Sequence, residues 1–449
     1  MEGRRWRSFS RILLAVSPVL IGCSNQEQGS SSKPPMGLDF YGKLPGLSAT
    51  PDPELRAEYT HIVEEGGTPE HLTLPPIPDE ENIAAGLRDL FPTEKLDEIL
   101  LETERIVPPV KLGFNYDPVR LHRAMVFWKQ YQQAWQKARE ALQRPRCQFG
   151  IRFIDGDGAD LSFIKTVWIV ARLEMFYAAD QLAKKQISEG MISLELLLRL
   201  AHCLGAEKHF EPRGQAAFLR SEALLLLEAI VRRPEIQRGH LEKLADLLQT
   251  HLAQWPSDAS AWIGERALGM HAYELVRDGR LLNLARPEEI EAMGGQSAAF
   301  QLAEIARQNV NLDELYYLRA MRRILEACSE PYFRRAALFE EIRVDLQQKR
   351  NTSEFPLVAG YMLLPNIENG HRLQAKDRAL CEAWATALSL GAGRKPPPYS
   401  VNPLTGQPYK ILRQNGRIEL VTGDPAHPQE EFRILVPDLA SKDSPQEKP

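Results

Sequence analysis

Large hydrophobic residues recur every three or four positions from about residue 80 to residue 391, which is the spacing of one face of an α-helix. The most apolar run lies between residues 160 and 185, where Lys165, Arg172 and Glu174 interrupt it. Because such charges are costly inside a bilayer, the run predicts a central buried helix and not a membrane span. We predict further helices at 94–106, 118–142, 191–204, 215–233, 234–254, 258–277, 296–308, 312–328, 331–349 and 372–390.

Short turns separate several of these helices, for example at Pro234, at Trp255-Pro256 and at Asp278-Gly279. Amphipathic helices joined by short turns pack antiparallel, which indicates helical hairpins or a solenoid. The helix pairs have the spacing of repeats of roughly 34 to 47 residues, but no residue signature recurs along them. We therefore predict a mainly α fold, an irregular bundle or solenoid of antiparallel helices that occupies residues 80–395.

The pattern changes near the C-terminus. Asn415-Gly416 lie between two short runs of alternating hydrophobicity, at 409–412 and 418–421, which is typical of a β-hairpin. Residues 432–436 predict a third strand. The sequence thus predicts a small β-hairpin element at 396–437 and a disordered polar tail at 438–449.

The first 22 residues resemble a bacterial lipoprotein signal peptide. Four arginines lie within the first eleven residues, and a short apolar run follows at residues 12–21. The run ends in Leu20-Ile21-Gly22-Cys23; in lipoproteins an apolar pair and a small residue precede the cysteine that receives the acyl chains. We therefore predict cleavage after residue 22 and lipidation of Cys23. The alternative is an ordinary signal peptide that contains a cysteine.

Residues 23–79 predict a flexible tether followed by an irregular segment, because Ser, Gly, Pro and Gln are common at first and prolines interrupt any helix later. The formal net charge is −5 and the pI is about 6.1, so nucleic acid is not an expected partner. Loss of residues 1–22 would remove four arginines and one glutamate, which makes the remaining chain more acidic. The membrane partner is therefore expected to be held by the lipid and not by charge, and Ser24 favours the outer membrane.

Four cysteines follow Cys23, at Cys147, Cys203, Cys328 and Cys381. An oxidising envelope permits disulfides among them, and four cysteines allow three pairings. Cys203 and Cys381 lie inside apolar helical patterns, where buried free thiols are equally expected. The sequence leaves the pairing open, and no spacing is typical of a zinc site.

Two segments carry oxygen or nitrogen ligands but fall short of a metal site. Asp155 to Asp160 resemble a calcium loop, yet Thr166 stands at the twelfth position, where an EF-hand needs glutamate, so a turn before a helix is favoured. His271 and Glu274 lie three residues apart on one predicted helix. They would need further ligands such as His202 and His209, so a packing role is favoured.

Two other segments resemble catalytic motifs without their surroundings. Ser162 to Lys165 match the SxxK of penicillin-binding enzymes, but their third motif is missing. Gly295 to Ala299 are nearly a GxSxG elbow, but the preceding residues predict helix where the elbow needs a strand. No phosphate-binding loop, dinucleotide glycine pattern or HExxH occurs. We therefore predict no catalytic residue, metal or cofactor.

Two further segments carry a resemblance. Glu265 to Gly269 read ERALG in the helical middle, and Asn402 to Tyr409 read NPLTGQPY before the predicted hairpin. Here the chain resembles a group of uncharacterised bacterial envelope proteins common in planctomycetes, whose tails are similar to those of type II secretion pseudopilins. The resemblance covers residues 150–436 and implies no activity or catalytic residue. Glu265 and Arg266 are predicted to form a buried ion pair that holds neighbouring helices together.

These features predict a lipid-anchored protein of the cell envelope with a structural or protein-interaction role and an unidentified protein partner. One alternative is an enzyme or small-ligand receptor with a cleft between helices, acting on cell-wall material. Another is an accessory component of a secretion apparatus, which only the tail suggests. Two convergent carboxylates or a metal in a deep pocket would favour the enzyme, and exposed apolar patches would favour binding.

Overall fold

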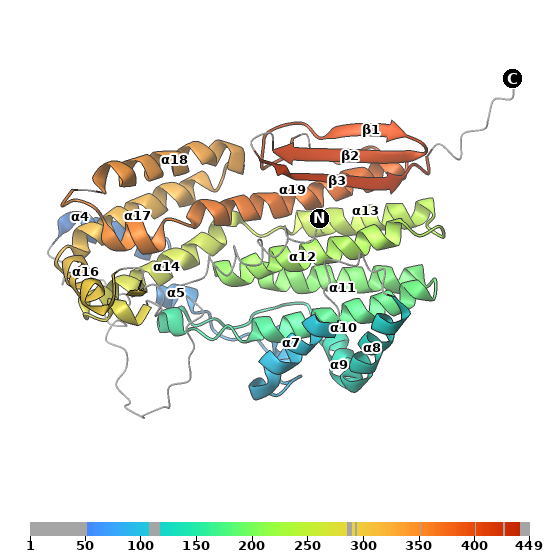
Figure 1. Cartoon of the computed structure of the whole chain (residues 1–449), viewed down its shortest axis with the longest axis horizontal. Helices are drawn as coiled ribbons and strands as arrows, with labels where there is room; N and C mark the ends of the chain where they lie inside the picture. The colour runs from blue at the N-terminus through green and yellow to red at the C-terminus, as the bar shows by residue number, and fades with distance from the viewer. Residues whose placement is uncertain are drawn as a thin grey trace, which may run out of the picture.

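The chain folds into stacked helices with a small antiparallel sheet at one end, as Figure 1 shows for the computed structural model. This confirms the predicted mainly α fold with a small C-terminal β-element. The predicted signal peptide, Cys23 and residues 24–51 of the predicted tether lie outside the described residues. The structure describes residues 52–106, 117–284, 290–291, 294–350, 352–399, 401–424 and 427–440.

Three long helices joined by short turns pack antiparallel in the centre of the molecule. They are α10 (Phe163–Ala183), α11 (Ile187–Ala206) and α12 (Phe210–Val231). The next helix, α13 (Arg238–Ala253), packs mainly on the later helix α19 (Ile367–Gly391). α10 is buried on several sides, as its hydrophobic pattern predicts, because α7, α8 and α11 all pack against it. Within the described ranges, no helix combines the length and the apolar character that a bilayer crossing requires.

A second group of helices encloses a hydrophobic core of its own. It contains α4 (Pro53–Glu64), α14 (Asp258–Arg277), α16 (Gln296–Gln308), α17 (Val310–Ala327) and α18 (Tyr332–Lys349). The bounds of α14 and α16 are those that the sequence predicts, because their hydrophobic pattern starts and stops sharply at turn residues.

The long helix α19 (Ile367–Gly391) connects the two cores. Ile367 and Ala375 near its start belong to the second core, whereas Trp384 and Leu388 near its end belong to the first. In Figure 1 it runs along the molecule from the second group of helices to the sheet. One continuous helix therefore fixes the two groups relative to each other.

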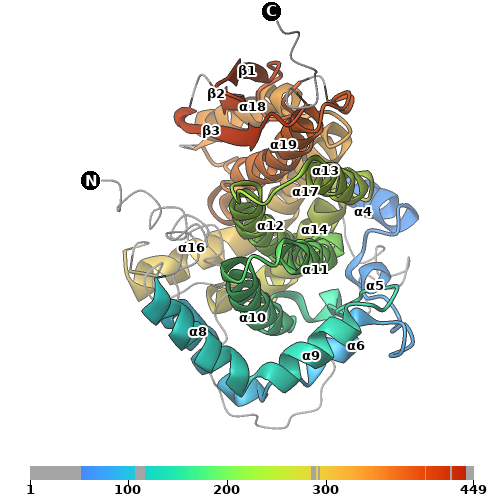
Figure 2. The same cartoon turned by 90° about the vertical axis from the view of Figure 1, so that its right-hand side faces the viewer.

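A curved outer layer covers α10 and is seen at the bottom of Figure 2. It contains α6 (Ile83–Arg88), α7 (Leu96–Ile106), α8 (Pro118–Gln130) and α9 (Gln132–Ala141). The sequence predicts one helix at 118–142, but the backbone bends at Tyr131, where φ is −107° and ψ is 15°. The bend lets Trp128 and Trp135 pack against each other and against Tyr177 of α10. Short helical segments lie at η1 (Thr93–Lys95), η3 (Phe153–Gly158, kinked at Gly156), η4 (Leu281–Leu284) and η5 (Ala359–Leu363).

The segment before residue 79 is more ordered than the sequence predicts. Asp52 caps α4 by accepting hydrogen bonds from two backbone N–H groups of its first turn, and Pro69–Leu72 form the short helix α5. Leu55, Tyr59 and Ile62 lie on one face of α4 and are buried in the second core. The prediction of an irregular segment at 23–79 is therefore wrong for these two helices. The apolar face of α4 is short, and the sequence alone does not show that α17 packs against it.

The C-terminal sheet has three antiparallel strands in the order β1-β2-β3, with bounds Lys410–Gln414, Arg417–Asp424 and His427–Pro437. Asn415 and Gly416 both have positive φ, of 53° and 67°, and form the predicted two-residue turn. The third strand is also confirmed.

The inner face of this sheet is part of the first hydrophobic core, because β2 and β3 pack on α19. Order continues past β3: the Asp438 N–H donates to the Gly416 carbonyl at 2.9 Å, and Leu439 is buried. The prediction of a disordered tail at 438–449 is wrong for these first residues, and residues 441–449 lie outside the described part of the chain. The buried residues of the inner face are Ile418, Leu420, Ile434 and Val436.

Candidate functional site

The predicted ion pair between Glu265 and Arg266 does not form, because neighbouring residues of α14 point to different partners. Arg266 donates to the Glu65 carboxylate at 3.2 Å and is fully buried. Glu265 instead accepts a hydrogen bond from the Phe210 backbone N–H at 3.0 Å. Both residues do join helices as predicted, but Arg266 ties α14 to the end of α4, and Glu265 ties it to the start of α12.

The glycines of this segment allow close helix contacts. Gly264 faces the Lys208 carbonyl, and a Cβ at position 264 would overlap that oxygen. Gly269 lies against the ring of Tyr317, whose hydroxyl donates to the Glu265 carbonyl at 3.0 Å. The ERALG segment is therefore a helix junction, at which Glu265 and Arg266 each bind a different neighbouring segment.

Burial shifts the ionisation of the junction. Loss of water raises the pKa of Glu265 to about 7, and it lowers the pKa of the adjacent His209 to about 4. The His209 Nδ1 accepts from the Glu211 N–H at 3.1 Å, which requires a neutral ring with its proton on Nε2. Near neutral pH, His209 therefore caps α12 as a neutral acceptor.

A chain of buried charges fills the contact between α12, α14, α18 and α19. The Arg220 guanidinium holds the Asp377 carboxylate, with its Nε 2.8 Å from Oδ2. The Asp258 carboxylate receives Arg213 at 3.4 Å and Arg335 at 2.8 Å. Each charge has an opposite partner, so the set specifies helix packing and leaves no free charged group for a reaction.

The other motifs are separated in space. The His271 Nδ1 lies 3.9 Å from the Asp157 carboxylate of η3, whereas Glu274 pairs with Arg277. The His202 ring faces His251, with 6.1 Å between centroids. Among the described residues, no group of three or more His, Cys, Asp or Glu side chains is placed to hold a metal ion.

The SxxK and GxSxG segments also have structural explanations. Lys165 forms an ion pair with Asp97 of α7 at 2.8 Å, so its ammonium is bound to a carboxylate of the outer layer. Ser297 lies in the first turn of α16, preceded by a turn and not by a strand. Neither segment has the geometry of a nucleophile with a base.

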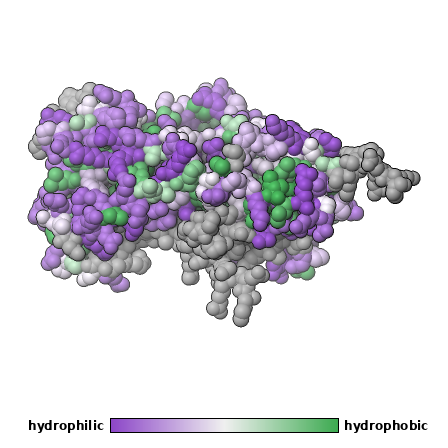
Figure 3. Space-filling view, turned by 90° about the horizontal axis from the view of Figure 1, so that it is seen from above, coloured by the Kyte–Doolittle hydropathy of each residue, from purple (hydrophilic) through white to green (hydrophobic). Residues whose placement is uncertain are grey.

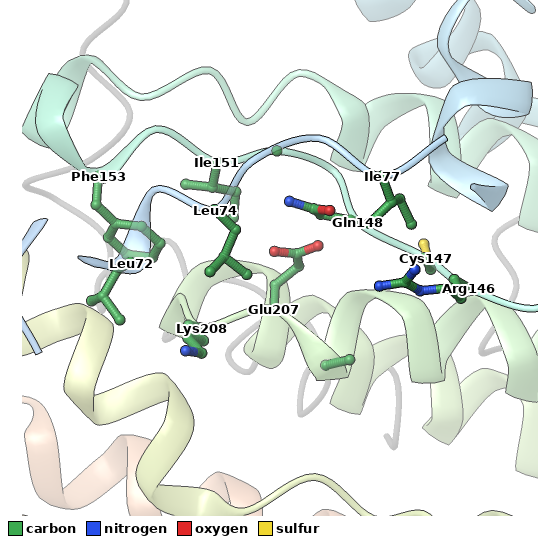
Figure 4. Close-up of a pocket in the computed structure, with 12 residues that line it drawn as sticks. Leu72, Leu74, Ile77, Arg146, Cys147, Gln148, Ile151, Phe153, Glu207 and Lys208 are labelled. Atoms are coloured by element: carbon green, nitrogen blue, oxygen red, sulfur yellow. The ribbon is translucent and has the colours of Figure 1, made fainter. Parts of the chain in front are cut away.

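One hollow opens where the end of α11 meets the chain segments before α6 and after α9 (Figure 4). Its cavity volume is about 190 Å³. We call it the Glu207 hollow, and its lining is mostly apolar with a few polar groups. The lining residues are Leu72, Leu74, Ile77, Arg146, Cys147, Gln148, Gly150, Ile151, Phe153, Ala206, Glu207 and Lys208.

Glu207 is the group in this hollow with unusual chemistry. Figure 4 shows its carboxylate in the middle of the lining side chains, with Leu74 on one side and Arg146 on the other. Burial raises its pKa to about 7, against a stabilising hydrogen bond from the Phe149 N–H at 2.9 Å. Glu207 follows the last residue of α11, and the negative end of the helix acts in the same direction. A carboxyl near half-ionisation can donate or accept a hydrogen bond at neutral pH.

Sequence reasoning did not identify Glu207. A glutamate followed by a lysine at the end of an apolar helix has the pattern of an ordinary solvated helix end. Its burial depends on segments 72–77 and 146–151 closing over it, and no local pattern encodes that.

Comparisons with protein-family models, with curated proteins and with solved structures find no match to this chain.

Proposed function

We propose that this chain is a lipid-anchored protein of the cell envelope whose helical body has a structural or protein-interaction role. The anchor is the predicted lipidation of Cys23 in the Leu-Ile-Gly-Cys segment. The observation that carries the proposal is the attachment of α4, the first described helix of the chain, to α17.

Several contacts hold α4 in place. The Tyr59 hydroxyl donates to the buried Glu314 carboxylate of α17. Arg319 and Arg322, one turn apart on α17, reach the Glu58 carboxylate at 3.7 and 3.1 Å. A tether that ends in such a helix would hold the whole body at the membrane. As a flexible chain, about 30 residues would span about 30 Å.

Buried charges also fit a structural role. Arg213 pairs with Asp258 and Arg220 with Asp377, and these ion pairs hold neighbouring helices together. Figure 3 shows one face of the molecule with hydrophobic residues scattered among hydrophilic ones. Large exposed apolar residues that a partner could cover include Val126 of α8 (55% exposed) and Phe300 of α16 (60% exposed).

The anchor is tested by metabolic labelling with a palmitate analogue. We expect label on the wild-type chain and on Cys328→Ser, and none on Cys23→Ala, which should also leave the membrane fraction. Cys328→Ser is the matched control because it removes another thiol without touching the signal sequence. Label or membrane association that survives in Cys23→Ala would refute the proposal.

The interaction role is tested with a photo-crosslinking amino acid at position 126 or position 300 in living cells. We expect an adduct of one reproducible mass from the anchored chain, lost in the Cys23→Ala background. A crosslinker at the exposed position Glu140 on α9 is the control for random collisions. Adducts that are equal at all three positions, or absent at 126 and 300, would contradict an interaction role.

A second candidate function, a receptor for a small ligand, is favoured by the Glu207 hollow. Its apolar walls suit a ligand with an apolar body, and the carboxyl suits a hydroxyl or amine on that ligand. Glycoside hydrolysis needs two facing carboxyl groups, and Glu207 is the one carboxyl of the described lining. The hollow therefore fits binding better than cell-wall cleavage.

Thermal-shift screening with small alcohols and amines that carry an apolar group tests this candidate. A hit should raise the Tm of the wild type and of Glu140→Gln but have a much smaller effect on Glu207→Gln. Hits that are insensitive to Glu207→Gln, or a screen without hits, would argue against the receptor.

A further inference from the structure

One stripe of α11 faces the chain segment that follows α9. Arg199 and Cys203 are four residues apart and so share one face of α11, and Glu207 follows directly after the last residue of the helix. At one end, the Arg199 guanidinium donates to the Arg144 carbonyl at 2.5 Å. At the other end, Glu207 accepts from the Phe149 N–H at 2.9 Å. These two hydrogen bonds align residues 144–149 with the stripe and place position 147 opposite Cys203.

The two cysteines lie close together. The hydrogen bonds at residues 144 and 149 place Cys147 opposite Cys203, and the Cys203 thiol raises the pKa of the Cys147 thiol. Cys147 is half-buried and lines the Glu207 hollow, whereas Cys203 is buried behind it. The other two cysteines lie elsewhere: the Cys328 thiol donates to the Ile324 carbonyl, and Cys381 is buried in α19 beside Asp377. Of the pairings among the four cysteines, the fold brings this one together.

We propose that Cys147 and Cys203 are a cross-linking site, at which a disulfide ties the segment after α9 to α11. The compartment in which this happens rests on the proposed export to the envelope, where thiols are oxidised. Both cysteines are free thiols in the structure, which shows the reduced form. The bond would fix the wall of the Glu207 hollow formed by residues 146–151.

The oxidant is a small or protein disulfide, and the exchange is balanced. The Cys147 thiolate attacks the oxidant and forms a mixed disulfide, with release of one thiol. The Cys203 thiolate then attacks the Cys147 sulfur and displaces the second thiol. Two protein thiols and one disulfide thus become one protein disulfide and two thiols. Cys147 is the first to react because it is open to the hollow.

The reaction has a characteristic pH dependence. Contact with Cys203 and burial both raise the pKa of the Cys147 thiol. Since the thiolate is the nucleophile, cross-linking of the folded protein should be slow at neutral pH and faster at alkaline pH.

The first test uses the full chain carrying Cys23→Ala, treated with oxidised glutathione at alkaline pH and mapped as non-reduced peptides. We expect one linked pair of peptides that contain Cys147 and Cys203, with loss of two free thiols. Cys147→Ser and Cys203→Ser should each abolish it, and the double control Cys328→Ser/Cys381→Ser should keep it. The bond closes a loop of about 55 residues, so we expect Tm to rise by about 4 °C. Stable glutathione adducts, or links to Cys328 or Cys381, would overturn the proposal.

The second test separates the cross-link from the proposed location. Cells are quenched with acid and their free thiols alkylated before lysis, and the same peptides are then mapped. A Cys147–Cys203 link in cells supports both proposals. A link that forms with glutathione but is absent in cells would refute the oxidising envelope and leave the cysteine pair intact. Failure with glutathione refutes the pair whatever the cells show.

Discussion

Single carboxyl groups that are buried or half-buried make the stability of this protein depend on pH. Glu207, Glu265 and Glu314 each have a pKa raised to about 7, mainly because burial removes water from the charged form. A raised pKa in the folded state means that the unfolded chain loses the proton more easily. These residues therefore favour the folded state at low pH, and that contribution is lost as the pH rises towards 7. The pKa of His209 is lowered in the folded state, so His209 destabilises the fold as the pH falls below about 6.5, where the unfolded chain takes up the proton first.

Replacing Glu265 with Gln should flatten this dependence. In the wild type, the contribution of Glu265 to the free energy of unfolding falls between about pH 4.5 and about pH 7, by on the order of 3 kcal/mol. Glutamine keeps the shape and the acceptor for the Phe210 N–H but cannot ionise. Urea unfolding should be measured at about pH 5 and about pH 8. The free energy of unfolding of Glu265→Gln, relative to that of the wild type, should be larger at the higher pH. The exposed control Glu140→Gln should have the same pH dependence as the wild type. If Glu265→Gln also kept the pH dependence of the wild type, Glu265 would not titrate in this range.

A methyl group at position 264 should be strongly destabilising. The Cβ of Gly264→Ala would overlap the Lys208 carbonyl oxygen, which is backbone and cannot rotate away. We expect a loss of about 3 kcal/mol or more, by analogy with overpacked cores. Gly239→Ala is the matched control, because Gly239 also lies in a helix but has nothing near its Cβ position. That change should stabilise by up to about 1 kcal/mol, so opposite signs in thermal unfolding are the expected result.

Among the elements, α4 shows how the order of a short helix depends on the helix that it packs against. Its 12 residues would be marginal as an isolated helix, and its order comes from capping by Asp52 and from burial against α17. The bend between α8 and α9 has a similar origin, because both halves pack on α10. In each case, contacts between distant segments determine where a helix begins, bends or ends.

Truncation of Leu55 should release α4 while the rest of the fold persists. Leu55 is fully buried, and Leu55→Ala should cost about 2–5 kcal/mol through lost burial and the cavity left behind. Hydrogen exchange should then become faster in the peptide 53–64 before it changes in α10 or α11. Glu64 is an exposed residue of the same helix, and Glu64→Ala is the control. This change should leave hydrogen exchange in α4 almost unchanged. Uniform loss of protection throughout the chain would show that α4 does not open on its own.

At the scale of the whole molecule, α19 and its buried charges hold two hydrophobic cores and a sheet together. The sheet contributes Ile418, Leu420, Ile434 and Val436 to the first core. Deletion of residues 396–449 would expose that core, so loss of a secretion phenotype after such a deletion could reflect misfolding. Exposed residues of the sheet, such as Arg413, are better positions for testing a role in secretion.

Loss of the Asp377 charge should destabilise the whole fold. Asp377→Asn leaves Arg220 buried without its counter-charge, which costs about 3–5 kcal/mol in comparable pairs. Because the pair joins α12 to α19, we expect one cooperative transition with a lower Tm by calorimetry. The exposed ion pair of Arg334 and Glu330 is the control, and Glu330→Gln should have little effect. An unchanged Tm in Asp377→Asn would mean that the buried pair contributes little to the connection between the two cores.

Hydrophobic periodicity by itself determined the helical class, the bounds of α14 and α16, and the hairpin at Asn415-Gly416. These features are local, because they depend on neighbours three or four residues apart or on a two-residue turn. The same reasoning predicted that Glu265 and Arg266 matter for helix packing. It named the wrong partners, since Arg266 meets Glu65 about 200 residues away.

Only the tertiary structure decided which side chains meet. The placement of Cys147 opposite Cys203, the partial burial of Glu207 and the order of α4 all require segments that are distant in the sequence to pack against one another. A single sequence specifies the faces of its helices but not which faces pack together, because many pairings bury similar apolar area. Buried charges such as Arg220 and Asp377 then discriminate among those pairings, and they can be recognised as partners only after the helices are placed.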